Sequence, residues 1–243
     1  MSTYQDVIAA QGAVAAWALT EAAGLSFAPY IGGQPLVGSG TFAYRQAGPF
    51  ASAFGLQINV GGKLGLPFVA PVNVPVSFEC WYKLALPLAA AQYLYYNGNA
   101  GANGNGVYVK NTDAHLHYFA GGGIIDKDLG VLWPDSAWHH FVSGVDTNQA
   151  LTFYLDGVTL FRGLLNSPLA PNPNELFIGA DSSTSSATVV AIATPAYYIK
   201  ALTPAQAAND FLASTDPSTA LSNTMGSSGD LLTSIWNAVH KVY

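Results

Sequence analysis

The sequence predicts an all-β protein, an antiparallel β-sandwich with a short N-terminal helix and a C-terminal helical extension. From about residue 35 to 200, short apolar segments recur at about ten-residue spacing with turn signals between them, which is typical of antiparallel sandwiches and barrels. Half of the 243 residues are apolar, enough for a substantial core. Only 9% are charged, against about 25% in ordinary domains, so the chain is expected to fold rather than to be disordered.

The chain is expected to begin with a short helix and a buried strand. In "STYQDVIAA", Ser2 or Thr3 can cap a helix, and Asp6 follows Thr3 by three residues, close to a capping box. The apolar segment "GAVAAWAL" then predicts a buried strand that ends near Leu19.

Two turns stand out among the strands that follow. Asn111, Thr112 and Asp113 form a polar turn that splits "GVYVKNTDAHLHYFA" into two strands. Asp156 and Gly157 predict a two-residue hairpin, because both residues adopt positive φ readily. The remaining predicted strands are "FGLQINV", "VPVSFECWYKLAL", "WHHFVSGVD", "LTFYLDGVTLFRG", "NELFIGAD" and "TVVAIATPAYYIKAL".

The C-terminal part is predicted to be helical. Thr203 caps a helix with Pro204 at its first position and Gln206 three residues after the cap. We therefore divide the chain into a sandwich at 1–213, a linker at 214–229 and an amphipathic helical tail at 230–243. The tail places one apolar face at helical spacing, formed by Leu231, Leu232, Ile235, Trp236 and Val239.

This apolar face would be costly to leave in water, at about 25 cal/mol per Å². We expect it to bind another subunit or further copies of the chain. The alternative is that it packs on its own sandwich.

The histidines are the most conspicuous candidates for chemistry. His139 and His140 are adjacent on a predicted strand, so their side chains point to opposite faces and cannot bind one ion together. His115 and His117 do share a face, but the sequence offers no third ligand beside them. We therefore interpret all four as strand histidines that make hydrogen bonds.

Five segments in the right order carry a resemblance to a known family. "SAWHHFVSGVDTNQALTFYLDGV" resembles the strand–turn–strand signature of laminin G-like, concanavalin A-type jelly rolls. The resemblance covers about residues 4 to 213, includes the opening strand of bacterial and phage versions, and implies a jelly-roll sandwich in which the Trp and His side chains are scaffold. The other matching segments are "VIAAQGAVAAWALTEAAG", "VSFECWYKL" with Phe78, Glu79 and Trp81, "NELFIGAD", and "ALTPAQAANDF".

The same fold carries glycosidases, whose catalytic strand presents several carboxylates on one face. Here the matching strand supplies only Glu79, with no second acid nearby in the sequence. Asp126 and Asp128 are two apart and would project together, but Lys127 between them favours an exposed edge with local neutralisation. There is no Gly-x-Ser-x-Gly elbow and no phosphate-binding Gly-Lys-Ser/Thr loop, so the chain is not expected to be an enzyme.

No cofactor is expected. Many laminin G-like domains bind calcium, but the aspartate that the family often carries before its second sheet strand is missing from "INVGGKLGLP". Asp181, followed by hydroxyl residues, is the one calcium candidate.

The segment "YLYYNGNAGANGNGVYV" is the candidate ligand-binding loop. Aromatic faces and amide groups together suit a sugar, through stacking and hydrogen bonds, and loops on rigid scaffolds often carry binding. The alternatives are a hairpin connection in which Asn and Gly merely satisfy left-handed turns, or a loop that embraces a neighbouring subunit. The candidate residues are Tyr95, Tyr96, Asn97, Asn99, Asn103 and Asn105.

These features favour a structural protein of a bacteriophage virion, either a capsid decoration or a tail-associated adhesion protein. The alternative is a carbohydrate-binding lectin module, and a glycoside hydrolase ranks third. The expected partners are virion subunits or further copies of the chain, and also a host-surface glycan. With net charge −6 and eight dispersed Lys and Arg, nucleic acid is not a partner, and no apolar run is long enough for membrane insertion. Lacking a signal peptide, the chain is expected to be made in the host cytoplasm and released within virions by lysis.

Overall fold

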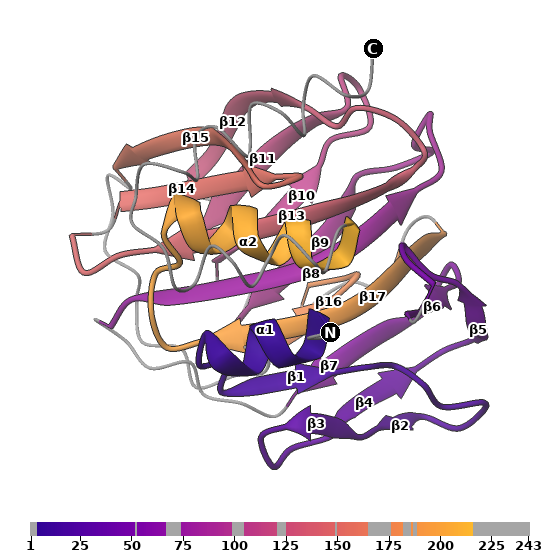
Figure 1. The fold of residues 1–243 in the computed structure, drawn as a ribbon. Coiled ribbons are helices and arrows are strands. Elements are labelled where there is room, and N and C mark those ends of the chain that lie inside the picture. The colour runs from indigo at the N-terminus through magenta and orange to yellow at the C-terminus, as the bar shows by residue number, and fades with distance from the viewer. Residues whose placement is uncertain are drawn as a thin grey trace.

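The fold is a sandwich of two antiparallel β-sheets, as the sequence predicts (Figure 1). The computed structural model describes residues 4–51, 53–66, 74–98, 105–120, 125–148, 150–164, 176–181, 186 and 189–215. Within them, the nine-stranded sheet has the order β15-β14-β13-β8-β17-β1-β3, and β6 pairs with both β17 and β5. Its strands are β1 (Ala15–Trp17), β3 (Pro29–Ile31), β5 (Phe42–Ala47), β6 (Phe54–Ile58), β8 (Val76–Leu84), β13 (Trp138–Val145), β14 (Ala150–Leu155), β15 (Val158–Leu164) and β17 (Val190–Tyr198).

The second sheet has eight strands in the order β12-β11-β10-β9-β16-β7-β4-β2. Its strands are β2 (Ser26–Phe27), β4 (Leu36–Ser39), β7 (Lys63–Leu66), β9 (Gln92–Asn97), β10 (Asn105–Val109), β11 (His115–Ala120), β12 (Ile125–Leu132) and β16 (Leu176–Ile178). The early strands β2 and β3 are too short to show an alternating pattern, and the sequence did not predict them.

The main core lies between the sheets and follows from side-chain alternation along each strand. In β8, Phe78, Cys80 and Tyr82 point inward and are almost completely buried. The intervening Glu79 and Trp81 point to the outer face of the nine-stranded sheet, where Trp81 joins a second apolar cluster.

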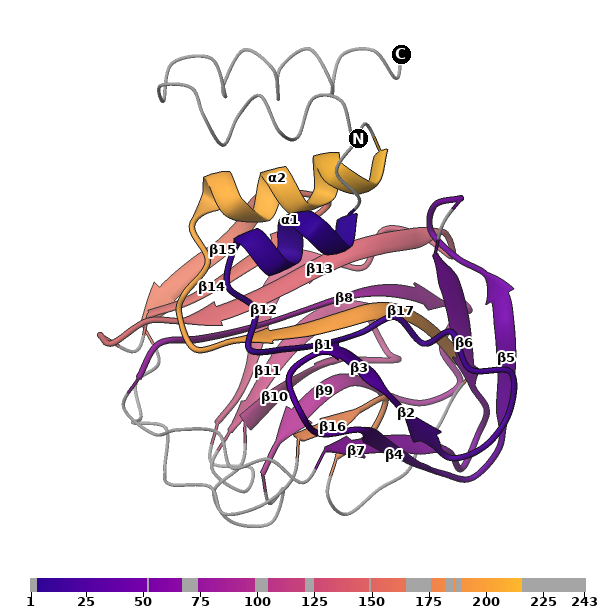
Figure 2. The same cartoon turned by 60° about the horizontal axis from the view of Figure 1, so that its bottom comes forward.

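Two helices cover part of the outer face of the nine-stranded sheet, α1 (Tyr4–Ala10) and α2 (Pro204–Thr215) (Figure 2). The predicted capping box of α2 is confirmed, since the Thr203 amide donates to Gln206 Oε1 at 3.0 Å and the Gln206 amide donates to Thr203 Oγ1 at 3.2 Å. Neither described helix has the length and apolarity needed to cross a membrane. The predicted linker begins at 214, but α2 continues to Thr215. The rest of the linker, from 216, and the tail at 230–243 lie outside the described residues.

The β14–β15 hairpin forms at the predicted turn. Asp156 and Gly157 both have positive φ, 50° and 76°, as a type I′ turn requires. The predicted turn at 111–113 also forms, between β10 and β11. The first strand ends earlier than predicted, because β1 stops at Trp17 and Leu19 takes a φ of 54°, which is incompatible with a strand.

Replacing Gly157 by Ala is expected to cost about 2 kcal/mol of stability. Its φ disfavours any Cβ, and the added atom would lie 3.1 Å from Ala208 Cα in α2. Gly61→Ala is the matched control, because Gly61 has a φ of 85° but no heavy atom within 4 Å of the new Cβ. Denaturant unfolding should show a cost about 1 kcal/mol smaller for the control. Equal costs would mean that the contact with α2 contributes nothing.

His139 and His140 point to opposite sides, as strand alternation predicts. His139 lies between Asp156 and Asp135, with Nδ1 2.7 Å from one carboxylate and Nε2 3.0 Å from the other. His140 is completely buried below the helices, where Tyr4 Oη lies 3.2 Å from its Nε2. They do not converge on one site.

Candidate functional site

A pocket of about 380 Å³ opens on the outer face of the nine-stranded sheet. Its central residues form one line across four strands, because Trp138 pairs with Lys83, Lys83 with Ala191, and Ala191 with Gln57. Paired residues on neighbouring antiparallel strands point to the same face, so all four side chains project outward. The complete lining is Gln46, Ala47, Gln57, Lys83, Leu84, Ala85, Leu86, Ser136, Trp138, Val189 and Ala191.

The hollow arises from small residues and from the curl of the sheet. Strands β5 and β6 turn up at one end of the sheet and form a side wall (Figure 2). A Cβ on Gly55 of β6 would lie only 2.9 Å from Trp138 Cζ2, so glycine allows the indole ring to approach this wall. The short side chain of Ala191 leaves the floor between Lys83 and Gln57 open.

The polar groups of the pocket are held in place by neighbours. The Gln57 amide donates to Asn59 Oδ1 at 2.8 Å, and the Gln46 amide donates to the Tyr44 carbonyl at 2.9 Å. Lys83 is exposed, and no carboxylate in the described part of the chain forms an ion pair with it. The pocket therefore combines one aromatic side chain with oriented amides and an ammonium group. Trp138 was expected to be scaffold, but it is only partly buried and lines this pocket.

The residues predicted to bind a ligand do not form an open surface. Tyr95 points into the core and its hydroxyl hydrogen-bonds Ser143 Oγ at 2.8 Å, while burial raises its pKa to about 12. Tyr96 is completely buried against Phe177 on the outer side of the eight-stranded sheet. The prediction that these two rings offer faces to a ligand is therefore wrong.

The asparagines of the predicted loop are only partly described. Asn97 and Asn105 pair across β9 and β10, are 7% and 9% exposed, and line a cavity of about 20 Å³ together with Tyr95. That volume holds about one water molecule. Asn99 and Asn103 lie outside the described residues, so their predicted role stays a prediction.

Glu79 does have an acidic neighbour, which the sequence could not show. Asp210 of α2 lies against it, and both carboxyl groups are fully buried. Tyr4 and Tyr198 donate hydrogen bonds to Glu79 Oε1 at 3.2 and 3.1 Å, and Gln11 donates to Asp210 Oδ1 at 2.6 Å. Burial raises the pKa of Glu79 to about 7, and burial followed by the charge of Glu79 raises that of Asp210. Sealed from solvent, this pair joins α2 to the sheet.

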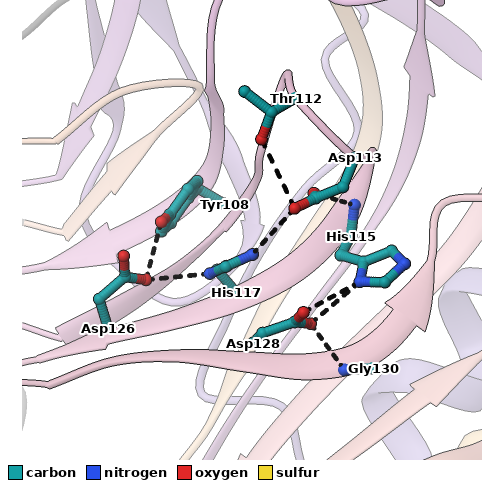
Figure 3. A network of polar contacts seen from close by, with 8 residues as sticks. All are labelled: Tyr108, Thr112, Asp113, His115, His117, Asp126, Asp128 and Gly130. Carbon is teal, nitrogen blue, oxygen red and sulfur yellow. Dashed lines mark hydrogen bonds and ion pairs between the residues drawn. The ribbon is translucent and has the colours of Figure 1, made fainter.

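A cluster of His and Asp side chains lies on the outer face of the eight-stranded sheet (Figure 3). His115 Nδ1 lies 3.0 Å from Asp128 Oδ2, and His117 Nδ1 lies 3.0 Å from Asp126 Oδ1. Asp113, His115 and Asp128 place ligand atoms within 4.8 Å of one another. The sequence offered no third ligand for the two histidines, but the turn and β12 bring carboxylates beside them.

The calcium candidate Asp181 is 3% exposed. It lies beside Tyr93, whose pKa is raised by burial and then by the Asp181 carboxylate. The hydroxyl residues that follow it at 182–185 lie outside the described residues, so calcium binding there stays a prediction.

Comparison with known proteins places the fold. A family model described as "Concanavalin A-like lectin/glucanases superfamily" matches residues 61–208. No curated protein matches the sequence significantly.

Several solved structures share the fold at low identity. The botulinum neurotoxin serotype D binding domain has a TM-score of 0.63 at 10% identity over 82% of this chain and 51% of its own. Trypanosoma rangeli sialidase has a TM-score of 0.63 at 14% identity over 85% of this chain and 33% of its own. Domain 4 of AbnA, a GH43 extracellular arabinanase from Geobacillus stearothermophilus solved with arabinotriose, has a TM-score of 0.63 at 18% identity over 82% of this chain and 97% of its own. The chain thus spans half of the first structure and a third of the second, but nearly all of the arabinanase domain.

Proposed function

Because the chain belongs to the concanavalin A-like lectin/glucanases superfamily, we propose that it is a carbohydrate-binding module that holds an oligosaccharide in the pocket beside Trp138. The observation that carries this proposal is the line of outward side chains from Trp138 through Lys83 to Gln57. The arabinanase domain, solved with arabinotriose, matches the present fold over almost its whole length, which supports binding of a sugar by such a sandwich.

The chemistry of the pocket suits a sugar. The indole ring of Trp138 offers an apolar face against which the C–H groups of a sugar ring can pack. Gln46 and Gln57 offer amide groups and Lys83 an ammonium group for hydroxyl or acidic substituents. The volume of about 380 Å³ falls in the range of about 300–1,000 Å³ usual for small-molecule sites.

The pocket fits sugar binding better than glycoside hydrolysis. Glycoside hydrolysis uses two carboxyl groups beside the scissile bond, and no Asp or Glu is found among the described residues that line this pocket. Glu79 and Asp210 are a carboxyl pair, but both are fully buried. We therefore propose no catalytic role for the chain.

The proposal predicts that substitutions in the pocket weaken glycan binding. A panel of oligosaccharides, arabinan fragments included, is titrated calorimetrically into the full chain. Trp138→Ala and Ala191→Phe should each weaken binding at least tenfold, the first by removing the stacking face and the second by filling the floor. Lys83→Ala should weaken acidic glycans more than neutral ones.

Asn111→Ala, in the exposed β10–β11 turn, is the control and should bind like the parent. Circular dichroism confirms that each variant is folded. Parent-like affinity in all three pocket variants would show that the glycan binds elsewhere, and an absence of any glycan binding would remove the proposed function.

A structural role in a bacteriophage virion is the second candidate, supported by the charged fraction of 9%. A surface poor in charge is less stable as a free colloid and suits contact with other subunits or further copies of the chain. Sedimentation and affinity chromatography separate the two functions. A stable multimer without retention on polysaccharides supports assembly, whereas a monomer that is retained and then eluted by an oligosaccharide supports the module.

A further inference from the structure

We propose that Asp113, His115, His117 and Asp128 bind a divalent transition-metal ion of the zinc class on the outer face of the eight-stranded sheet. This site lies on the other sheet from the Trp138 pocket, and the proposal is independent of carbohydrate binding.

The backbone brings the four side chains together from two elements. Strand alternation puts His115 and His117 on the same face of β11, and β12 presents Asp128 opposite His117. The turn before β11 brings Asp113 beside them (Figure 3). The ligand atoms of Asp113, His115 and Asp128 all lie within 4.8 Å of one another.

The spacing of the ligand atoms suits a tetrahedral ion. Two ligand atoms bound to the same tetrahedral zinc lie about 3.4 Å apart, given bond lengths of about 2.0–2.2 Å. His115 Nδ1 lies 3.0 Å from Asp128 Oδ2, and His117 Nε2 lies 4.0 Å from Asp113 Oδ2. These two distances lie on either side of that spacing.

His117 is arranged as a metal ligand through its second ring nitrogen. Asp126 Oδ1 lies 3.0 Å from His117 Nδ1 and also accepts the Tyr108 hydroxyl at 2.7 Å. Because a carboxylate accepts hydrogen bonds, the proton of the neutral imidazole resides on Nδ1, and Nε2 keeps its lone pair. A carboxylate that orients a histidine in this way is the usual support of a zinc ligand.

The Nε2 atom of His117 has no hydrogen-bond partner although the residue is 4% exposed. A buried polar atom left unsatisfied costs about 1–3 kcal/mol. Figure 3 shows this nitrogen directed toward Asp113, on the side where His115 and Asp128 also lie. An ion at this position would give the nitrogen its missing partner.

The charge around the cluster also favours a cation. Lys127 was expected to neutralise Asp126 and Asp128, but its Nζ lies 5.1 Å from the ring centre of Phe161 in the opposite sheet. The expectation of local neutralisation is therefore wrong. Among the described residues, no Lys or Arg forms an ion pair with Asp113, Asp126 or Asp128.

The backbone holds two of the carboxylates before any ion binds. The Gly130 amide donates to Asp128 Oδ1 at 2.8 Å, and the His115 amide donates to Asp113 Oδ1 at 2.9 Å. Imidazole ligands suit zinc, nickel and cobalt, whereas calcium takes oxygen ligands almost alone. The donor set therefore selects the zinc class over calcium.

The test is a calorimetric titration of the chelator-treated full chain with zinc chloride. The expected result is one ion per chain, and at least a tenfold loss of affinity in His115→Ala and in His117→Ala. Asp126→Asn, which changes the orienting group only, should lower affinity about tenfold. Cobalt in place of zinc should give the intense visible absorption of a tetrahedral site in the parent, and this absorption should be lost in His117→Ala.

His139→Gln is the matched control, because His139 also lies between two aspartates but outside the cluster. It should bind zinc like the parent, and calcium in equal amount should not displace zinc. Circular dichroism shows whether the variants are folded. Zinc binding that survives the double variant His115→Ala/His117→Ala, that depends on His139, or that is displaced by calcium would overturn the proposal. Binding weaker than millimolar would overturn it as well.

Discussion

As the pH rises from 4.5 to 7, the Glu79→Gln variant is expected to gain about 3 kcal/mol of stability relative to the parent. The pKa of Glu79 is raised from its ordinary value of 4.5 to about 7 by burial. A carboxyl group that holds its proton more tightly when folded stabilises the fold below pH 4.5. This stabilisation disappears as pH rises from 4.5 to 7. A difference of this size between the folded and the ordinary pKa corresponds to about 3 kcal/mol of stability.

Glutamine removes this titration and keeps the local hydrogen bonds. Its Oε1 can still accept the hydroxyls of Tyr4 and Tyr198, which donate to Glu79 Oε1 in the parent. Its amide can donate to Asp210, where the parent needs a proton between two acids. The variant therefore isolates the charge of Glu79 from the packing of α1 and α2.

His140 makes a comparison with the parent necessary at each pH. Burial lowers its pKa from 6.5 to about 4, so its contribution is present above pH 6.5 and is lost as pH falls toward 4. This trend opposes that of Glu79, and because His140 Nε2 lies 3.8 Å from Glu79 Oε2, the variant is compared with the parent at the same pH throughout. Denaturant unfolding at several pH values measures the difference, with Asn111→Ala as a non-titrating control. A difference that stays constant between pH 4.5 and 7 would contradict the raised pKa of Glu79.

Gly106→Ala is expected to lower the free energy of unfolding by about 3 kcal/mol, because no space exists for a side chain there. Gly106 pairs with Tyr96 in β9. A Cβ at this position would meet the Tyr95 carbonyl and would lie 2.5 Å from Tyr96 Cδ2 and 2.9 Å from Tyr96 Cα. Two of these atoms belong to the backbone, so the sheet itself would have to shift.

Gly33→Ala is the control, since its new Cβ has no heavy atom within 4 Å. Thermal or denaturant unfolding of both variants measures the contrast. A loss below about 0.5 kcal/mol for Gly106→Ala would show that β9 and β10 separate easily, and would argue against close packing of Tyr96 over the glycine.

Local sequence features predicted the structure well. The Thr203–Gln206 capping box and the Asp156–Gly157 hairpin each depend on neighbouring residues, and both form as expected. Strand alternation also depends only on neighbouring residues, and it correctly placed the side chains of His139 and His140 on opposite sides of the sheet. The order of short strands was also sufficient for the sandwich class.

The candidate sites could not be predicted, because they depend on register between distant strands. Nothing in the sequence pairs Trp138 with Lys83 or Ala191 with Gln57. The alternation rule alone also could not say which ring of the Tyr95–Tyr96 pair enters the core. A long-range contact of the same kind places Asp210 against Glu79. Tyr95 and Tyr96 were therefore expected to offer their rings to a ligand, although both are buried.

The two proposed sites lie on the outer faces of different sheets, so the sandwich core separates them. The hollow beside Trp138 belongs to the outside of one sheet and the His117 cluster to the outside of the other. With sheets about 10 Å apart, a glycan and a metal ion would not compete for space. If the protein were tethered through the metal ion on one sheet, the outer face of the other sheet would stay open to a polysaccharide. The sandwich would then hold two different partners at the same time.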